Sequence, residues 1–453
     1  MAAIPYGPPP AVRGPAPRRA PALLPGVLQT AGWAGAAGVL ALWWYDTADV
    51  TGAAGWLTGA GRITGLLAGY ACAVLLLLMA RVPALDRGIG TDRLARWHAM
   101  GGRYAVCLAL AHTLLIVWGY ALTTRTGVVD QTTTLVLRYP EMLKGTAGFL
   151  LLVATGVLSA RVARRRLSYE TWHYLHFATY LAVFLVFGHQ LANGADFVDH
   201  RAARTLWYVL YLGVAAAVLW YRFLLPVRRS LRHRLTVAAV RTEAPGVVSV
   251  YVTGRRLDEL GARAGQFLRW RFLTPGLWWT ASPYSLSAAP RPDALRITVK
   301  ALGAHSEALA RLEPGTRVWI EGPYGGLTAD RAAGRRTLLL AGGIGITPLR
   351  SLLETLPGVV TLVYWAHRPE DLALREELES LAVRLGHRVV CSVSDPAGHR
   401  VPLTAGTLAE LAPGLAEHDV YVCGPPGMTR DALRALRVAG VPRGRVHHES
   451  FAF

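Results

Sequence analysis

The sequence predicts a multidomain protein: a six-helix transmembrane bundle, then an antiparallel β-barrel domain, then an α/β domain with a parallel sheet. Three observations predict this order. Apolar blocks near the roughly 20 residues of a spanning helix fill the first half of a 453-residue chain that is 52% hydrophobic and 17% charged. Short β-branched runs follow from about Arg234, and a strand, a Gly-rich turn and a helix follow from Arg336.

Four regions follow from these changes of pattern. Residues 1–28 are rich in Pro and Arg and are expected to form a disordered cytoplasmic tail. The transmembrane region is expected over 29–228, the barrel over 229–332 and the α/β domain over 333–453. The six apolar stretches lie at about 29–45, 62–82, 98–122, 142–160, 172–191 and 205–225.

Loop charge predicts the orientation of the spans. One set of connections, together with both flanks, carries sixteen arginines, whereas the other set carries five. Cytoplasmic loops carry the excess of Lys and Arg in membrane proteins. We therefore expect a multi-pass protein of the cell membrane with both termini in the cytoplasm.

The net charge of +19 does not predict a nucleic-acid partner. Much of the charge lies at the ends of apolar stretches, where the orientation of the spans requires it, and no recognition motif accompanies it. The four cysteines, Cys72, Cys107, Cys391 and Cys423, show no CxxC spacing. Neither a thiolate zinc site nor a disulfide framework is therefore expected.

Four histidines are the strongest functional signal. His98 and His112 lie in the third apolar stretch, and His176 and His189 lie in the fifth. Ionisable side chains inside membrane segments are rare and mark functional sites. The two spacings correspond to roughly 21 and 20 Å along a helix. Since the third and fifth spans run in the same direction, His98 pairs with His176 near the cytoplasm and His112 with His189 near the outside, which predicts bis-histidine ligation of two stacked b haems.

Helical geometry is harder to satisfy in the fifth span. Fourteen residues return to within roughly 40° of the starting face, but the thirteen residues from His176 to His189 end roughly 140° away. A kink or bulge is therefore expected, with Gly188 as its place. His173 remains an alternative ligand, although its spacing to His189 gives no better angle.

The strands that follow predict a small antiparallel barrel. A hairpin is expected in RLTVAAVRTEAPGVVSVYV, and further strands in GQFLRWRFL, ALRITVKAL and TRVWIEGPYGG. The segment Ser282-Pro283-Tyr284-Ser285 places an aromatic ring beside a hydroxyl on a Pro-led strand, which suits a flavin ring and its N5 atom. Lys300, Gly303 and Ser306 follow at a spacing that suits a diphosphate.

The last region predicts a nucleotide-binding domain. Gly342, Gly343 and Gly345 lie between an apolar strand and a helix, where the backbone can approach a pyrophosphate. Arg368 follows the next strand and can pair with a ribose 2′-phosphate, which favours NADPH over NADH. Cys423 ends the strand in DVYVCGPPGM at the nicotinamide end, and Phe453 is an aromatic side chain able to cover a flavin face.

The chain resembles the ferric reductase and NADPH oxidase superfamily in the order of its motifs. These are the four membrane histidines, P-Y-S, G-x-G-x-T-P, C-G-P-P and the terminal Phe. The likeness covers nearly the whole chain after the tail. It implies a ferric-reductase-like transmembrane haem domain fused to a ferredoxin–NADP reductase module with FAD and NAD(P) domains. It implies haem ligation by His98 with His176 and by His112 with His189.

The resemblance also implies the soluble contacts. Flavin contacts are implied for Pro283, Tyr284, Ser285, Val299, Lys300 and Ser306, with Phe453 stacked on the ring. Nucleotide contacts are implied for Gly343, Gly345, Thr347, Pro348, Arg368, Cys423, Gly424 and Pro425. Ser285, Cys423 and Phe453 are the candidate catalytic residues, because they are expected where flavin and nicotinamide meet.

Three positions bear on how closely the chain follows the family. Ser282 stands where relatives often have Arg or His. Ile116 stands where the superoxide-forming oxidases have a further outer histidine, so superoxide is not implied as the product. Arg62 matches a basic residue near their oxygen site.

The expected function is that of a transmembrane oxidoreductase. Electrons would pass from cytoplasmic NAD(P)H through FAD and two b haems to an external acceptor, a ferric chelate or oxygen. The alternative is a membrane haem carrier that delivers electrons to a partner protein. The fused reductase module argues against this alternative, because the chain already holds its own electron source.

Overall fold

The computed structural model describes residues 24–45, 47, 50–160, 166–167, 169–198, 200–334, 336–394 and 402–450. The chain divides into two compact units, a helical unit that ends at Phe223 and a second unit that begins at Leu224. The expected boundary after residue 228 falls inside helix α11 (Leu225–His233).

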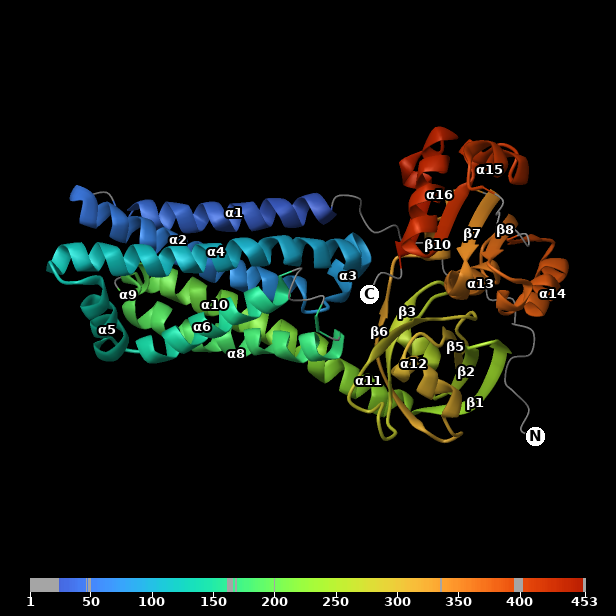
Figure 1. The fold of residues 1–453 in the computed structure, drawn as a ribbon, viewed down its shortest axis with the longest axis horizontal. Coiled ribbons are helices and arrows are strands. Elements are labelled where there is room, and N and C mark those ends of the chain that lie inside the picture. Colours follow the sequence, from blue (N-terminus) through green and yellow to red (C-terminus); the bar gives the residue numbers. More distant parts are fainter. Residues whose placement is uncertain are drawn as a thin grey trace. The chain divides into compact units, whose positions relative to one another are not determined.

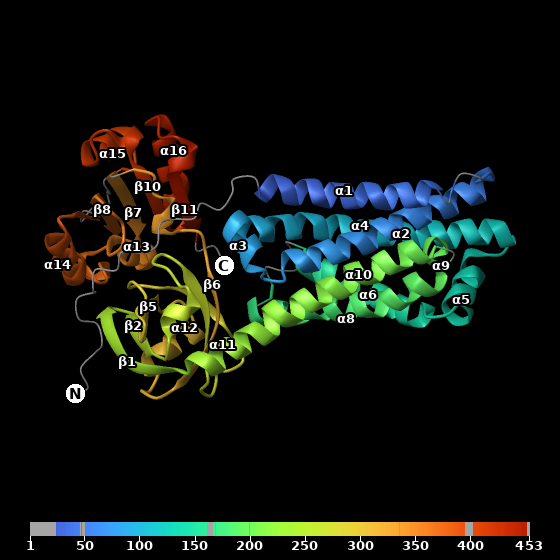
Figure 2. The same cartoon turned by 180° about the vertical axis from the view of Figure 1, so that it is seen from behind.

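The helical unit holds the six predicted apolar stretches as long helices. Short helices lie between them, with α3 at one end of the unit and α5 and α9 at the other (Figure 1 and Figure 2). The helices are α1 (Leu24–Tyr45), α2 (Gly52–Leu78), α3 (Pro83–Ile89), α4 (Thr91–Thr124), α5 (Val128–Arg138), α6 (Met142–Ser159), α8 (Tyr169–Asn193), α9 (Ala195–Val198) and α10 (Arg201–Val218), followed by a π-helical turn, Leu219–Leu224.

Five helices of the described chain are long and apolar enough to cross a membrane. They lie at Gly52–Leu78, Arg93–Thr124, Met142–Ser159, Thr171–Asn193 and Arg201–His233. Helix α1 does not join them, so the predicted count of six spans is supported for five.

Glycines bring these helices into close contact. A Cβ atom on Gly61 of α2 would lie 2.8 Å from Ile116 of α4, and one on Gly119 of α4 would lie 2.4 Å from Thr58 of α2. Helix α6 approaches α8 in the same way, because a Cβ on Gly148 would lie 2.8 Å from the carbonyl oxygen of Ala182. Small residues at such contacts allow the close packing on which helix association in membranes depends.

The second unit begins with a six-stranded antiparallel sheet of strand order β4-β3-β6-β1-β2-β5. The predicted hairpin is present, and Gly246 turns it with a φ of +68°. A single bridge between Leu286 and Ile297 brings the two edges together beyond β4, whereas closure into a full barrel stays a prediction. The strands are β1 (Leu235–Ala244), β2 (Val247–Thr253), β3 (Phe267–Phe272), β4 (Ser282–Ser285), β5 (Ala294–Lys300) and β6 (Arg317–Tyr324), with α12 (Ala304–Ala308) after β5.

A five-stranded parallel sheet of order β11-β10-β7-β8-β9 completes the unit, as predicted. Its strands are β7 (Arg336–Gly342), β8 (Val359–Ala366), β9 (Arg388–Val393), β10 (Asp419–Gly424) and β11 (Val446–Ser450). Its helices are α13 (Ile346–Leu353), α14 (Arg375–Leu385), α15 (Ala405–Leu411) and α16 (Pro426–Val438).

Both faces of the parallel sheet are covered, as parallel sheets require. Leu339 and Ala341 of β7 pack in a core with α13 and α14, whereas Leu338 and Leu340 point to a second core with α15 and α16 (Figure 1). Because successive side chains of a strand alternate between the faces, the continuous apolar run of β7 serves both cores.

Ile297 tests the core of the antiparallel sheet, since it is fully buried and forms the bridge between the edges. We expect Ile297→Ala to lower the free energy of unfolding by about 2–5 kcal/mol, because it leaves a cavity. Leu302→Ala, at a side chain that is 80% exposed, is the control and should change it by no more than about 0.5 kcal/mol. Thermal unfolding of the purified protein followed by tryptophan fluorescence measures both, and equal melting temperatures would contradict the assignment.

Candidate functional site

The four membrane histidines form two pairs. The ring centres of His98 on α4 and His176 on α8 are 5.8 Å apart, and those of His112 and His189 on the same two helices are 6.3 Å apart. These are the two pairings expected from the sequence. Since both pairs join α4 to α8 in the same order, the two helices run in the same direction.

Hydrogen bonds leave one nitrogen of each of three rings available. Nδ1 of His112 lies 2.8 Å from the carbonyl oxygen of Gly61, and Nδ1 of His98 lies 3.2 Å from that of Leu75, both on α2. A carbonyl can only accept, so Nδ1 carries the proton and Nε2 keeps its lone pair. Nδ1 of His176 lies 3.2 Å from the hydroxyl of Ser159. Histidines that ligate metals commonly donate their other N–H in this way.

The paired rings fit a metal ion held between them. Two metal–nitrogen bonds of about 2 Å put the ligating nitrogens about 4 Å apart, and each ring centre lies beyond its nitrogen. Centre distances of 5.8 and 6.3 Å therefore suit one ion per pair. Nδ1 of His189 is buried and has no hydrogen-bond partner within the described ranges, so this ring is held by packing.

The bulge expected in the fifth span is absent, because α8 is α-helical from Tyr169 to Asn193, whereas the kink stays a prediction. The rings of His176 and His189 still reach α4 for two reasons. Two helices that cross at an angle present different sides to each other along their length. In addition, each side chain can adopt more than one rotamer. Gly188, the expected place of the irregularity, allows a close contact between helices, because a Cβ there would lie 2.7 Å from the Glu141 carboxylate.

His173, the alternative ligand, lies elsewhere. Its ring packs against Phe177 with centres 4.6 Å apart, whereas the ring of His176 faces His98. The ring of Trp172 stacks on His176 at 5.1 Å, and its indole N–H donates to Ser159 at 3.2 Å. The geometry thus favours His176 over His173.

Two glycines support the rings and were missed in the sequence. A Cβ on Gly65 of α2 would lie 2.5 Å from Nδ1 of His112, and one on Gly145 of α6 would lie 3.1 Å from the ring of His189. Ser159 was missed as well. Two glycines four residues apart in an apolar helix, such as Gly61 and Gly65, predict close packing of that helix against another. They do not predict that the partner is the imidazole ring of a histidine.

Arg62, the basic residue noted in the sequence, is paired. Its guanidinium lies 2.7 Å from Asp196, whose side chain is 2% exposed. Asp196 belongs to the short helix α9. The positive charge of Arg62, the residue after Gly61, is therefore balanced by a buried carboxylate.

The strand β4 carries the expected flavin residues. Pro283 and Tyr284 are partly buried, and Ser285 is 4% exposed with a hydroxyl that has no hydrogen-bond partner in the described structure. A buried hydroxyl without a partner is costly, so it fits a ligand atom such as the flavin N5. The indole N–H of Trp270 donates to the carbonyl of Tyr284 at 3.0 Å and fixes the strand.

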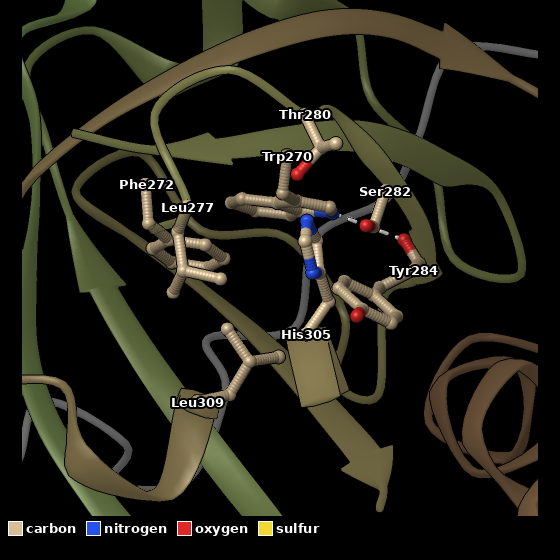
Figure 3. A pocket seen from close by; sticks show the side chains of 8 residues that line it. All are labelled: Trp270, Phe272, Leu277, Thr280, Ser282, Tyr284, His305 and Leu309. Atoms are coloured by element: carbon tan, nitrogen blue, oxygen red, sulfur yellow. Dashed lines mark hydrogen bonds between the residues drawn. The ribbon is translucent and has the colours of Figure 1, made fainter. Parts of the chain in front are cut away.

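A small pocket adjoins Tyr284. The side chains of Trp270, Tyr284 and His305 point toward one another around it (Figure 3). Burial raises the pKa of the Tyr284 hydroxyl, so it stays neutral at physiological pH. The pocket is lined by Trp270, Phe272, Leu277, Thr280, Ser282, Tyr284, His305 and Leu309.

The other expected flavin residues differ in accessibility. Val299 is 3% exposed within the core, so only its backbone can meet a ligand. Lys300 ends β5. The hydroxyl of Ser306 accepts the N–H groups of Leu302 and Gly303 at 2.8 and 3.1 Å and donates to the carbonyl of Gly303 at 2.9 Å. This hydroxyl caps α12 and leaves no proton for a diphosphate.

The Gly-rich turn is built as predicted. Gly343 has a φ of +52°, which disfavours side chains. A Cβ on Gly345 would lie 2.2 Å from the carbonyl oxygen of Cys423, and one on Gly342 would lie 2.2 Å from the sulfur of Met428. The turn Gly343–Gly345 leads into α13, where Thr347 and Pro348 are buried in the first turn.

The end of β10 lies beside this turn. Backbone atoms of Gly424 and Gly342 approach each other, and Pro425 precedes α16. The side chain of Cys423 is fully buried, and burial raises the pKa of its thiol well above the ordinary value. It is therefore a neutral thiol in the core, and direct contact with a nicotinamide would need a rearrangement.

Glu449 is a residue that the sequence analysis missed. It is the register partner of Cys423 on β11, and its carboxylate accepts the N–H of Gly326 at 3.0 Å. Phe453, the expected cover of the flavin, lies outside the described residues. Arg368 follows β8 with a side chain that is 72% exposed and lies 3.5 Å from Glu370, so its guanidinium is accessible.

Two family models match the chain, one in each unit. Residues 64–187 match the ferric reductase like transmembrane component, a range that includes His98, His112 and His176 and ends two residues before His189. Residues 339–434 match the oxidoreductase NAD-binding domain.

Curated relatives resemble the reductase half. Over 189 residues the chain is 34% identical to ferredoxin–NADP reductase B of Sorangium cellulosum, which covers 37% of this chain and 77% of that protein. Over 228 residues it is 31% identical to the stachydrine N-demethylase reductase subunit of Rhizobium meliloti, covering 46% and 64%. The chain thus spans less than two thirds of the latter relative.

One solved structure is similar to about half of the chain. It is the flavohaem-like FAD/NAD-binding domain of nitric oxide dioxygenase from Vibrio cholerae, at 24% identity and a TM-score of 0.42, covering 49% of this chain and 99% of that one. The chain thus carries a match to the transmembrane component in its helical unit and a match to the NAD-binding domain in its second unit. The protein, which joins the two in one chain, belongs to the ferric reductase and NADPH oxidase superfamily.

Proposed function

We propose that the protein is a transmembrane oxidoreductase that takes electrons from cytoplasmic NAD(P)H and delivers them through FAD and two b haems to an external acceptor, ferric iron or oxygen. The observation that carries the proposal is that four histidines form two pairs, His98 with His176 and His112 with His189. Each joins α4 to α8, and the hydrogen bonds of His98 and His112 to α2 leave Nε2 available.

The orientation rests on loop charge. The connections rich in arginine, which include those before α4 and after α10, are on the cytoplasmic side. This puts the His98–His176 pair near the cytoplasm and the His112–His189 pair near the outside. The second unit then lies in the cytoplasm, where NAD(P)H is available.

The residues of the chain bind and orient the reactants. When bound, the flavin converts two-electron transfer from NAD(P)H into single electrons, which haem irons carry. Ser285 offers its hydroxyl to the flavin ring, and Tyr284 packs beside it. The backbone of Gly343–Gly345 and the first turn of α13 receive the pyrophosphate. Gly65 and Gly145 leave the space that the rings of His112 and His189 occupy.

Comparison of acceptors tests the proposal directly. The purified protein in lipid should show a reduced b-type haem spectrum on addition of NADPH. It should then be reoxidised by a soluble ferric chelate or by oxygen, with superoxide monitored in the same assay. Turnover only in the presence of a partner protein would favour the carrier alternative, and the lack of b-type haem would refute the proposal.

Replacement of the histidines distinguishes the ligands. We expect His176→Ala to remove about half of the haem, because one of two sites loses a ligand, and His173→Ala to keep both. Pyridine haemochrome analysis of the purified variants gives the stoichiometry. Equal haem content in the two variants would contradict the assignment of His176.

The nucleotide turn is tested by adding one methyl group. Gly345→Ala would press a Cβ against the carbonyl of Cys423, so the turn must shift and the KM for NAD(P)H should rise at least about tenfold, a cost of about 1.4 kcal/mol. Gly444→Ala is the control, because nothing lies within 4 Å of its Cβ. A steady-state titration with NAD(P)H gives both constants, and an unchanged KM for Gly345→Ala would argue against this turn.

Arg368 tests the choice of nucleotide. If its exposed guanidinium pairs with the 2′-phosphate, Arg368→Ala should raise the KM for NADPH about tenfold or more, as expected for the loss of a charge-assisted hydrogen bond worth about 1.5–3 kcal/mol. The KM for NADH should not change. Parallel loss with both nucleotides would show that Arg368 does not read the phosphate.

A further inference from the structure

Four charged side chains lie between the two sheets of the second unit, three of them buried. They are Arg296, Arg350, Glu354 and Glu377, called here the buried charge cluster. The side chains of Arg296, Arg350 and Glu354 are 3–4% exposed, and that of Glu377 is 31% exposed. Two positive and two negative charges make the cluster neutral, which is the condition for burying charges without a large penalty.

Glu377 of α14 joins the two sheets. One carboxylate oxygen accepts the guanidinium of Arg296 on β5 at 2.9 Å, and the other accepts that of Arg350 on α13. Arg350 also lies 2.5 Å from Glu354, one turn further along α13. Glu377 thus links β5 of the antiparallel sheet to two helices of the parallel sheet.

On the side of the antiparallel sheet, the cluster holds the segment after the flavin strand. Arg296 donates from Nε to the hydroxyl of Ser287 at 3.1 Å and from its terminal nitrogen to the carbonyl of Ser287 at 2.7 Å. Glu354 accepts the backbone N–H of Ala289 at 2.6 Å. Ser287 is two residues beyond Ser285, so these bonds fix the end of β4.

On the side of the parallel sheet, the cluster holds the helix after the nucleotide turn. Arg350 and Glu354 belong to or directly follow α13, whose first residue, Ile346, comes immediately after Gly345. A shift of α13 would carry the turn with it. The residues that hold the flavin and those that hold the nucleotide are therefore connected through charge-assisted hydrogen bonds, the strongest and most directional ones available.

We propose that Glu377 is a positioning residue, which fixes the flavin strand β4 relative to the nucleotide turn Gly343–Gly345 and so sets the geometry for hydride transfer. The inference rests on the proposed function. Glu377 is not among the residues assigned above to the flavin or to the nucleotide. Glu377 acts on the alignment of the nicotinamide with the flavin. A misplacement of the reacting groups by about 1 Å can lower the rate of the chemical step about a hundredfold.

The ionised state of Glu377 agrees with this role. Burial alone would raise the pKa of its carboxyl, but Arg350 and Arg296 outweigh that effect and lower it. The carboxylate is therefore charged at physiological pH and can accept from both guanidinium groups at once. A neutral amide of the same shape cannot, because one of its two arms is a donor.

The test compares Glu377→Gln with Glu376→Gln, a change at the adjacent exposed residue of the same helix. Full-length protein is mixed rapidly with NADPH without oxygen, and flavin bleaching and the long-wavelength charge-transfer absorbance are recorded. We expect Glu377→Gln to slow flavin reduction ten- to a hundredfold and to weaken the charge-transfer band, with little change in the NADPH concentration at half-maximal rate. Glu376→Gln should match the unmodified protein.

Glu377→Asp provides the rescue variant, since it keeps the charge and should recover part of the rate. Thermal unfolding of every variant is measured alongside. A lower melting temperature with an unchanged rate and charge-transfer band would overturn the inference, because it would show a merely structural role. If the unmodified protein shows no flavin reduction by NADPH, the proposed function fails first, and the inference fails with it.

Discussion

The hydrogen bond from an imidazole N–H to a backbone carbonyl is the interaction on which the membrane site depends. A histidine in an apolar environment must satisfy two ring nitrogens, and a carbonyl fixes which of them keeps its proton. Here α2 provides such carbonyls for His98 and His112. The same carbonyls have to remain within a regular helix, so the imidazoles must come close to its backbone, and Gly65 makes this possible for His112.

The sequence predicted the elements with a strong period and the pairing of the histidines. The length of the apolar stretches predicted the long helices, and the β-branched runs with their turn residues predicted the hairpin and strands. The position of each histidine along its span predicted its partner. Ideal-helix geometry failed for His176 and His189, because it describes a straight, isolated helix and ignores crossing and rotamers. Gly65, Ser159 and Glu449 were out of reach because each acts on a residue distant in sequence.

The buried state of two predicted residues was also hidden in the sequence. The sequence motifs predict that Cys423 and Val299 contact the nucleotide and the flavin. Both side chains instead belong to hydrophobic cores. A motif states which residue type occurs at a place in the chain. It does not state whether the backbone or the side chain is used there, and at Gly345 and Cys423 the backbone contact is the one that the structure shows.

The two carbonyls on α2 have a consequence for the length of the chain. Gly61 and Leu75 are fourteen residues apart, and so are their partners, His112 and His98. Two antiparallel helices with equal spacing form both bonds in one alignment only. Inserting or deleting one residue between Gly61 and Leu75 would turn one end of α2 by about 100° relative to the other, so that one histidine or the other loses its carbonyl. The fourteen-residue spacing within α2 therefore fixes the distance between the two histidine pairs along the bundle.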